Sequence, residues 1–189
     1  ISHTGILIIG LFSLNHEAFQ GGIMLAVNFG LAITGLLFTT GFIYWRTRTM
    51  LLTKLGGLFD HFPLIASAFF LSGLAIIGMP GTPGFDSVHL VLEASFERFG
   101  ALVTVAAAIG NVIAAGFLLW AFQKAFLAPK TGDISPAKPL DPVTNQERLL
   151  AIMVVSILLI VGFYPEPWLA LIENSLSGLS HLYGNMETN

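Results

Sequence analysis

The chain has 189 residues, of which 54% are hydrophobic and 10% charged, and its formal net charge at pH 7 is −3. Soluble domains carry about a quarter charged residues, so this composition, with a mean hydropathy of +0.80, excludes a soluble globular domain. The absence of cysteine from the sequence excludes a disulfide framework, an iron–sulfur cluster and a thiolate metal site in this chain. Continuous apolar runs such as "AIMVVSILLIVGF" are typical of membrane helices, whereas β-barrel strands alternate apolar and polar residues. We therefore predict an all-α polytopic membrane protein.

The apolar runs predict a series of membrane spans in chain order. The first is short and opens at "ISHTG", without an initiator Met or a signal-like leader, so we expect a truncated span in the C-terminal part of a longer protein. The proline-rich, charged stretch 128–148 is typical of a solvated loop. The predicted spans, which together form one transmembrane domain over residues 1–165, are Ile1–Leu14, Phe19–Trp45, Pro63–Met79, Ala101–Leu127 and Leu149–Tyr164.

The stretch "PGTPG" after the third span interrupts the helical pattern, because prolines remove amide donors and glycines disfavour a helix. The residues expected to break the helix are Pro80, Gly81, Pro83 and Gly84. Residues 85–99 are apolar again, but about fifteen residues are too few for a separate crossing, which needs about twenty. We therefore predict one discontinuous helix over about 63–97. Its break should face protein or water, because unpaired backbone groups are costly in lipid.

The basic residues are consistent with this topology. If residues 63–97 cross the membrane once, every basic residue except Arg98 lies on one side, which the positive-inside rule makes the cytoplasmic side. The residues on that side are Arg46, Arg48, Lys54, Lys124, Lys130, Lys138 and Arg148. The tail, residues 166–189, then lies on the opposite side. Its apolar residues at helical spacing predict an amphipathic segment at the membrane surface.

Three ionisable residues follow the predicted break. Asp86, His89 and Glu93 are spaced i, i+3 and i+7, so a helix beginning near Phe85 places them on one face. Ionisable side chains in a membrane segment are costly unless they face a polar interior, so these residues are candidates for a path of protons or hydrated ions. An imidazole beside a carboxylate can titrate near physiological pH. Two alternatives stay open: Asp86 caps the second half-helix, or His89 and Glu93 form a structural hydrogen-bonded pair.

Two further polar residues are candidates for the same path. His3, beside Ser2, is either part of a proton relay or a structural histidine at a helix end or in the interior. Asn28 lies in the middle of a span and close to the face of Thr39, eleven residues later. Such residues more often tie helices together than conduct ions, and both interpretations of Asn28 stay open.

No other chemistry is indicated by the sequence. It contains no glycine-rich phosphate loop, no serine nucleophile motif and no metal-ligand spacing outside the Asp86 group. Lys130 and Lys138 are too sparse for a nucleic-acid surface. We expect no catalytic residue, cofactor, metal or nucleic acid to belong to this chain.

Several motifs, in order, resemble one known family. The segments are "ISHTGILIIGLFSLN", "GGIMLAVNFGLAITGLLFTTGFIYWRTRT", "LGGL", "GMPGTPGF" and "VGFYPEPWL". They resemble the antiporter-like membrane subunit M of bacterial NADH:quinone oxidoreductase (complex I), called subunit 4 in mitochondria, and the resemblance runs from Ile1 to about Leu169. It implies the C-terminal part of a fourteen-helix fold with two inverted repeats, each containing a broken helix. It also implies a polar axis of Lys, His and Glu along the membrane centre.

The resemblance assigns His3 to the family's Ser-His-x-Gly motif and the helix break to Pro80–Gly84, while the family's catalytic lysines lie outside this sequence. Two positions depart from the pattern. Asn28 stands where the family usually has a histidine before Gly-Leu, and Val88 stands where Gly-Phe-x-Gly-Glu has its glutamate. Asn28 cannot be protonated, and the three ionisable residues after the break project roughly 100° to 160° around the helix from Val88. The departures imply either a rerouted polar axis or a divergent branch of the family.

By resemblance, the chain is a membrane-arm subunit that translocates protons, coupled to electron transfer elsewhere in the complex. NADH, FMN, iron–sulfur clusters and quinone are then expected on other subunits. The implied partners are the other membrane-arm subunits and the lipid bilayer, in the bacterial inner membrane or alternatively the mitochondrial inner membrane. Two alternatives stay open: a subunit of a related cation/proton antiporter, membrane-bound hydrogenase or inorganic-carbon uptake complex, and a non-conducting scaffold subunit.

Overall fold

The computed structural model describes residues 2–13, 16–129 and 141–177. All regular elements in these ranges are helices, and three of them are long and apolar enough to cross a membrane. The elements are α1 (Ser2–Phe12), α2 (His16–Thr47), the 3-10 turn η1 (Leu52–Lys54), α3 (Leu58–His61), α4 (Pro63–Ile77), α5 (Gly84–Phe99), α6 (Ala101–Phe122), the π-helical turn η2 (Gln123–Leu127), α7 (Asn145–Phe163) and α8 (Glu166–Ser177). The predicted fold class, all-α with a discontinuous helix, is confirmed.

Two spans begin earlier than the apolar pattern predicts. α2 begins at His16 instead of Phe19. α7 begins at Asn145 instead of Leu149, because Thr144 and Glu147 form a capping box. The Thr144 hydroxyl accepts from the Glu147 N–H at 3.3 Å, and Glu147 Oε2 accepts from the Thr144 N–H at 2.8 Å. These reciprocal bonds stabilise a polar first turn that a search for apolar residues does not detect.

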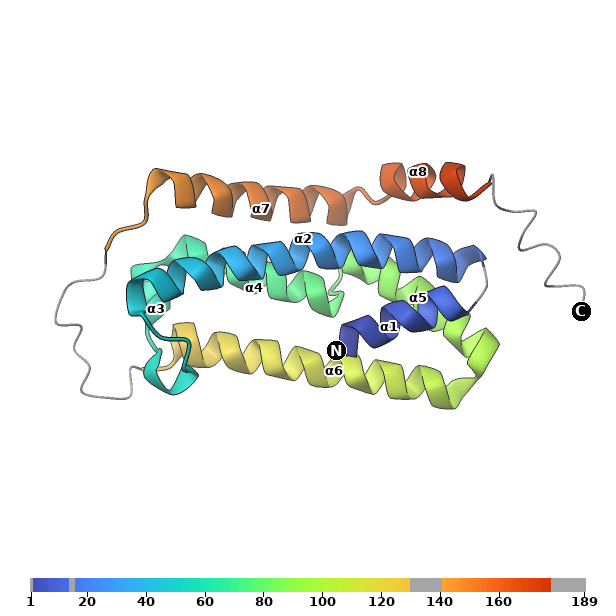
Figure 1. Cartoon of the computed structure of the whole chain (residues 1–189), viewed down its shortest axis with the longest axis horizontal. Helices are drawn as coiled ribbons and strands as arrows, with labels where there is room; N and C mark the ends of the chain where they lie inside the picture. The colour runs from blue at the N-terminus through green and yellow to red at the C-terminus, as the bar shows by residue number, and fades with distance from the viewer. Residues whose placement is uncertain (1, 14–15, 130–140, 178–189) are drawn as a thin grey trace, which may run out of the picture.

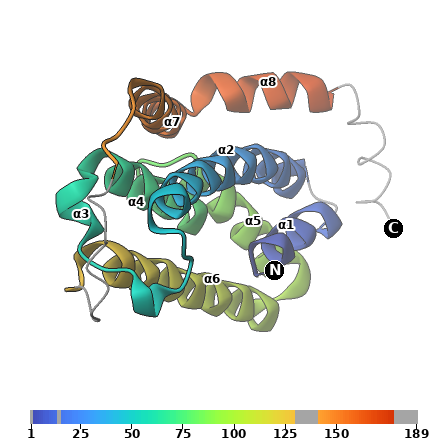
Figure 2. The same cartoon turned by 60° about the vertical axis from the view of Figure 1, so that its left-hand side comes forward.

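α2 is the central element of the fold. With 32 residues and a rise of 1.5 Å per residue, it is about 48 Å long. The half-helices α4 and α5, of 15 and 16 residues, lie end to end along it (Figure 1). Together they form one discontinuous helix, as the predicted single crossing over residues 63–97 requires. α6 and α7 lie on opposite sides of α2 and α4, as a second view shows (Figure 2).

The buried side chains of the described residues form apolar clusters along α2. One cluster joins α1, α2 and α5, a second joins α2, α4 and α7, and a third lies where α2, α3, α4 and η2 meet. Lipid is as apolar as these side chains, so close packing holds membrane helices together more than exclusion of water does. Fully buried members of the three clusters include Leu25 and Val91, Ala32 and Ala75, and Ile65 and Phe126.

The two ends of the helix bundle differ in charge. The end of α2, the turn η2 and the start of α7 share one end of the molecule (Figure 1), and α5 ends at the opposite one. The described basic residues of the first end are Arg46, Arg48, Lys54, Lys124 and Arg148, whereas Arg98 lies in the last turn of α5. Lys130 and Lys138 lie outside the described residues. The arrangement matches the predicted separation, and the assignment of the basic end to the cytoplasm stays a prediction.

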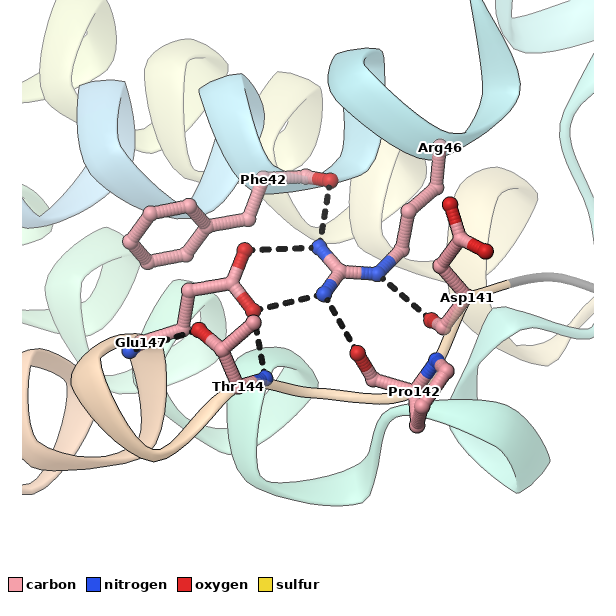
Figure 3. A network of polar contacts seen from close by, with 6 residues as sticks. All are labelled: Phe42, Arg46, Asp141, Pro142, Thr144 and Glu147. Atoms are coloured by element: carbon pink, nitrogen blue, oxygen red, sulfur yellow. Dashed lines mark hydrogen bonds and ion pairs between the residues drawn. The ribbon is translucent and has the colours of Figure 1, made fainter.

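Arg46, in the last turn of α2, ties α2 to the start of α7. Arg46 Nη1 and Nη2 donate to Glu147 Oε1 and Oε2 at 2.8 and 2.6 Å. The other three guanidinium donors bond to the carbonyl oxygens of Phe42, Asp141 and Pro142 (Figure 3). All five donors of the guanidinium are therefore used. The two charged side chains are only 2% and 14% exposed, so this is a shielded and geometrically specific pair.

α8 extends beyond α7 and lies beside the first half of α2 (Figure 1). Gln20 Nε2 donates to the Leu169 carbonyl at 3.3 Å. Leu169 and Ile172 are half-buried, while most of the other described side chains of the helix are exposed. The amphipathic character of the tail stays a prediction. Residues 178–189 of the predicted tail lie outside the described residues, and a position at the membrane surface stays a prediction.

Candidate functional site at the interrupted helix

α4 ends in a glycine cap. Gly78 has a φ of 76°, in the left-handed region that favours glycine. Its N–H bonds to the Ala75 carbonyl at 3.3 Å, and the Met79 N–H bonds to the Leu74 carbonyl at 3.1 Å. These bonds form a Schellman motif, which provides partners for two of the four carbonyls that a helix end leaves unpaired.

A tight turn then leads into α5. The Thr82 N–H bonds to the Met79 carbonyl at 3.0 Å, and Gly81 has a φ of 84°. Proline followed by glycine at the two central positions is typical of a type II turn. Of the residues expected to break the helix, Pro80, Gly81 and Pro83 lie in the interruption, and Gly84 is the first residue of α5.

Two glycines allow other segments to approach the break closely. A Cβ added to Gly84 would collide with the Ala75 carbonyl and lie 2.8 Å from Asn28 Nδ2. A Cβ added to Gly162 of α7 would collide with the Gly81 carbonyl. The break is therefore packed against protein on these sides, as its unpaired backbone groups require.

Asparagines from two different helices donate to the end of α4. Asn28 of α2 donates from Nδ2 to the Ala75 carbonyl at 3.1 Å. Asn111 of α6 donates from Nδ2 to the Ile77 carbonyl at 2.8 Å. Both carbonyls belong to the last turn of α4, where the helix itself supplies too few donors.

Four buried polar atoms in the described residues have no hydrogen-bond partner: His3 Nε2, Asn28 Oδ1, Ser72 Oγ and Asn111 Oδ1. The His3 and Phe29 rings form a T-shaped pair, with an interplanar angle of 87° and ring centroids 5.3 Å apart. An unsatisfied buried group costs about 1–3 kcal/mol, so such groups are normally satisfied by water or by another segment. Three of the four belong to side chains on α1, α2 and α6, and the fourth, Ser72, lies in the second half of α4.

An apolar cavity of about 440 Å³ lies beside Asn28, between α2, α7 and α8. Met24, Val161 and Trp168 are among the residues that line it, and Pro83 of the break contributes to its wall. Because the lining is almost wholly apolar, the cavity suits hydrocarbon and supplies no polar route to the break.

His89 and Glu93 lie on a face of α5 that points away from the other described helices. Their side chains are 72% and 58% exposed, and His89 Nε2 lies 3.8 Å from Glu93 Oε2. Val88, Val91 and Ala94 occupy the inward face of α5, so the described helices do not enclose His89 and Glu93. A role for His89 and Glu93 in proton transfer stays a prediction, and it requires a polar cover from outside the described residues.

Asp86 is the third candidate on α5, and Thr39 is the polar residue near the face of Asn28 on α2. Asp86 is half-buried in the first turn of α5, where its charge complements the helix dipole, but the N-cap position itself is Pro83 and makes no side-chain bond. Thr39 is buried and donates to the Gly35 carbonyl at 2.8 Å within its own helix. It therefore does not extend a polar path from Asn28.

Val88 packs in an apolar cluster and is 6% exposed, so no carboxylate replaces the missing one at this position. Apart from the shielded Arg46–Glu147 pair at the basic end, the buried polar residues in the described part of the chain are uncharged: Ser13, Asn28, Thr39, Ser72, Thr82, Ser87 and Ser95. No group of three His, Asp or Glu residues among those described could hold a metal ion.

Sequence reasoning missed Asn111. It is an amide in the middle of the apolar run "LVTVAAAIGNVIAAGFLLWAF". The rule that singled out Asn28, a polar residue inside a membrane span, applies equally to Asn111.

Comparison with known proteins identifies the family. Residues 1–122 match the family described as "NADH:quinone oxidoreductase/Mrp antiporter, TM". The chain belongs to this family. NADH-ubiquinone oxidoreductase chain 4 of Marchantia polymorpha is 29% identical over 181 residues, which cover 95% of this chain and 36% of that protein. The chain thus spans about a third of the length of the curated relatives it matches.

Chains of two solved structures share the fold of this chain. A chain of respiratory complex I from Thermus thermophilus with bound NADH has a TM-score of 0.78 and 28% identity, covering 94% of this chain and 37% of that chain. A chain of the Mrp complex from Dietzia sp. DQ12-45-1b has a TM-score of 0.79 at 18% identity, covering 90% of this chain and 39% of that one. At that identity the second likeness concerns the fold alone. The resemblance to subunit M or chain 4 is confirmed, and the chain is a membrane protein.

Proposed function

We propose that this chain is part of a membrane-arm subunit of a complex I-type NADH:quinone oxidoreductase and helps to translocate protons. The chain 4 relative and the complex I chain support this assignment. In the proposal the chain is the C-terminal part of its subunit, and other membrane-arm subunits are its partners. Those or further subunits hold NADH, FMN, the iron–sulfur clusters and quinone. The proposed location is the bacterial inner membrane, with the mitochondrial inner membrane as the alternative.

The interrupted helix, with buried unpaired polar atoms beside it, is the observation that carries the proposal. An unbroken helix satisfies its own backbone groups and offers nothing to a proton. Here, His3, Asn28 and Asn111 come from three helices, and each has a buried polar atom available to a further partner. Such a region can hold water inside a membrane protein, and His3 is the titratable member of the set. His89 and Glu93, on the outward face of α5, are further candidates for proton transfer.

Proton uptake driven by NADH oxidation tests the proposal. His3→Leu and, separately, Glu93→Gln are introduced into the full-length subunit, and uptake is measured in membrane vesicles that contain the assembled complex. Removal of a required proton carrier should slow uptake by roughly tenfold or more. Asp60→Asn is the control, because Asp60 is exposed on α3 at the basic end. Normal uptake in both variants, with normal assembly, contradicts a proton path through these residues.

A non-conducting scaffold subunit is the second candidate function, and the lack of buried charge around the interrupted helix, among the described residues, favours it. Val88 is packed in an apolar cluster, and the buried polar residues near the break, such as Asn28, Ser72 and Ser87, are neutral. A scaffold predicts that His3→Leu and Glu93→Gln leave proton uptake unchanged, whereas loss of the subunit prevents assembly of the complex.

A subunit of a related cation/proton antiporter, membrane-bound hydrogenase or inorganic-carbon uptake complex remains the other alternative. The family description includes Mrp antiporters. Identification of the subunits that co-purify with the full-length protein distinguishes these assemblies, because redox subunits accompany a complex I-type or hydrogenase-type arm.

A further inference from the structure

We infer that Asn28 and Asn111 act as paired amide clamps that position the end of half-helix α4 and so hold the interruption in one geometry. The clamp is inferred from hydrogen bonds within the chain, and only its consequence for transport rests on the proposed function. Both residues are positioning residues: they act on the backbone of the broken helix.

The clamps supply donors that the broken helix lacks. The Schellman bonds of the glycine cap reach the carbonyls of Leu74 and Ala75 but not that of Ile77. Asn111 Nδ2 donates to the Ile77 carbonyl at 2.8 Å, and Asn28 Nδ2 gives the Ala75 carbonyl a second donor at 3.1 Å. The last turn of α4 is therefore completed by side chains from elsewhere in the chain.

The two donors approach α4 from different helices. Asn28 lies on α2 and Asn111 on α6, and these helices lie on different sides of α4 (Figure 1). The bonds join residues 47 and 34 positions apart in the sequence. Held from two sides, the end of α4 cannot rotate or shift without breaking at least one bond.

Asn28 also touches the start of the second half-helix. A Cβ on Gly84 would lie 2.8 Å from Asn28 Nδ2, so the first residue of α5 packs directly on the amide that holds Ala75. One side chain of α2 therefore contacts both sides of the interruption. Because an amide keeps its donors and acceptor at every physiological pH, the clamp is permanent and does not open when the site gains or loses a proton.

Hydrogen–deuterium exchange in the assembled complex tests the clamps. Asn28→Leu and Asn111→Leu each remove one side-chain N–H that donates to a carbonyl of α4. The backbone N–H groups of Gly78, Met79 and Thr82 form the hydrogen bonds of the break itself, so their exchange reports on it. We expect about tenfold faster exchange at these amides, the effect of losing one buried hydrogen bond, with unchanged exchange in α7. Unchanged exchange at the break, or equally faster exchange throughout the chain, overturns the inference.

Thr104→Val is the matched control. Thr104 on α6 bonds to Ser95 on α5 at 3.2 Å, so this variant also removes a polar contact between α6 and the discontinuous helix, but near the far end of α5. We expect exchange at Gly78, Met79 and Thr82 to stay as in the unmodified protein. Faster exchange at the break in this variant too would show a general loosening and overturn the assignment to the asparagines.

Asn111→Asp gives a signature that a merely structural residue lacks. A protonated carboxyl group of the same shape can donate to the Ile77 carbonyl, whereas the ionised group cannot. The ratio of break exchange in this variant to that in the unmodified protein, taken at the same pH, should therefore rise as pH rises. A ratio independent of pH overturns the clamp.

Proton uptake by the two Leu variants separates the clamp from the proposed function. Slower uptake together with faster exchange at the break supports both the clamp and its consequence for transport. Faster exchange at the break with normal uptake supports the clamp and overturns its consequence for transport, and the proton path itself is then judged by the His3→Leu and Glu93→Gln variants alone.

Discussion

Gly84 is the residue at which the two half-helices meet most closely. It is buried, and an added Cβ would collide with the Ala75 carbonyl and press on Asn28 Nδ2. A backbone carbonyl cannot move aside as a flexible side chain can. A methyl group at this position therefore forces the backbone of the two half-helices to shift.

We expect Gly84→Ala to lower the stability of the full-length subunit by about 1–3 kcal/mol, the usual cost of overpacking a core. Thermal unfolding of the purified complex in detergent measures the effect. Gly116→Ala on α6 is the control, since nothing lies within 4 Å of an added Cβ there and alanine favours a helix by about 1 kcal/mol over glycine. Equal losses in the two variants would contradict the close contact at Gly84.

At the scale of elements, the Arg46–Glu147 pair links the end of α2 to the first turn of α7. The pair joins positions 101 residues apart, and the Arg46 side chain is 2% exposed. A buried guanidinium that loses its counter-charge is strongly destabilising, typically by about 3–5 kcal/mol.

A double-mutant cycle with Arg46→Met and Glu147→Ala should give a coupling energy of about 2–3 kcal/mol in the unfolding free energy. Glu147→Ala also loses the capping box with Thr144, and the double-mutant cycle cancels that contribution because it is present with and without Arg46. Arg48→Met is the control, because Arg48 is exposed and stacks on Trp45 at 4.6 Å, an interaction of about 0.5–1 kcal/mol. A coupling energy near zero would show that the contact contributes no stability.

The topology of the whole molecule depends on α4 and α5 forming one crossing. They lie end to end along α2, so the residues before α4 and after α5 are at opposite ends of the bundle (Figure 1). Two separate crossings would return the chain to the side from which it started.

Single cysteines test this topology, and the sequence offers a background without native cysteine in this region. Lys54→Cys should react with an impermeant maleimide from the cytoplasmic side of membrane vesicles, and Phe99→Cys from the other side. Asp141→Cys, before α7, should react from the same side as Lys54→Cys. Labelling of the positions at 54 and 99 from one side would overturn the single crossing.

Features that depend on neighbouring residues could be predicted from the sequence. The break at "PGTPG" follows from missing amide donors and from glycine's freedom at Gly78 and Gly81, and the long helices follow from their apolar runs. The start of α7 at Asn145 also depends on neighbouring residues only, because the Thr144–Glu147 capping box has a spacing that can be recognised in the sequence. The separation of basic residues toward one end also followed from the order of the spans.

The inward face of α5 and the partners of the break were decided only by tertiary packing. Periodicity places His89 and Glu93 on one face of the helix, but contacts with α1, α2 and α6 decide that Val88 and Val91 face inward instead. Asn28 and Asn111 meet the end of α4 across 47 and 34 residues of sequence. A hydrogen bond at such a separation depends on how helices pack against one another, and no local pattern in the chain encodes which carbonyl a distant amide will reach.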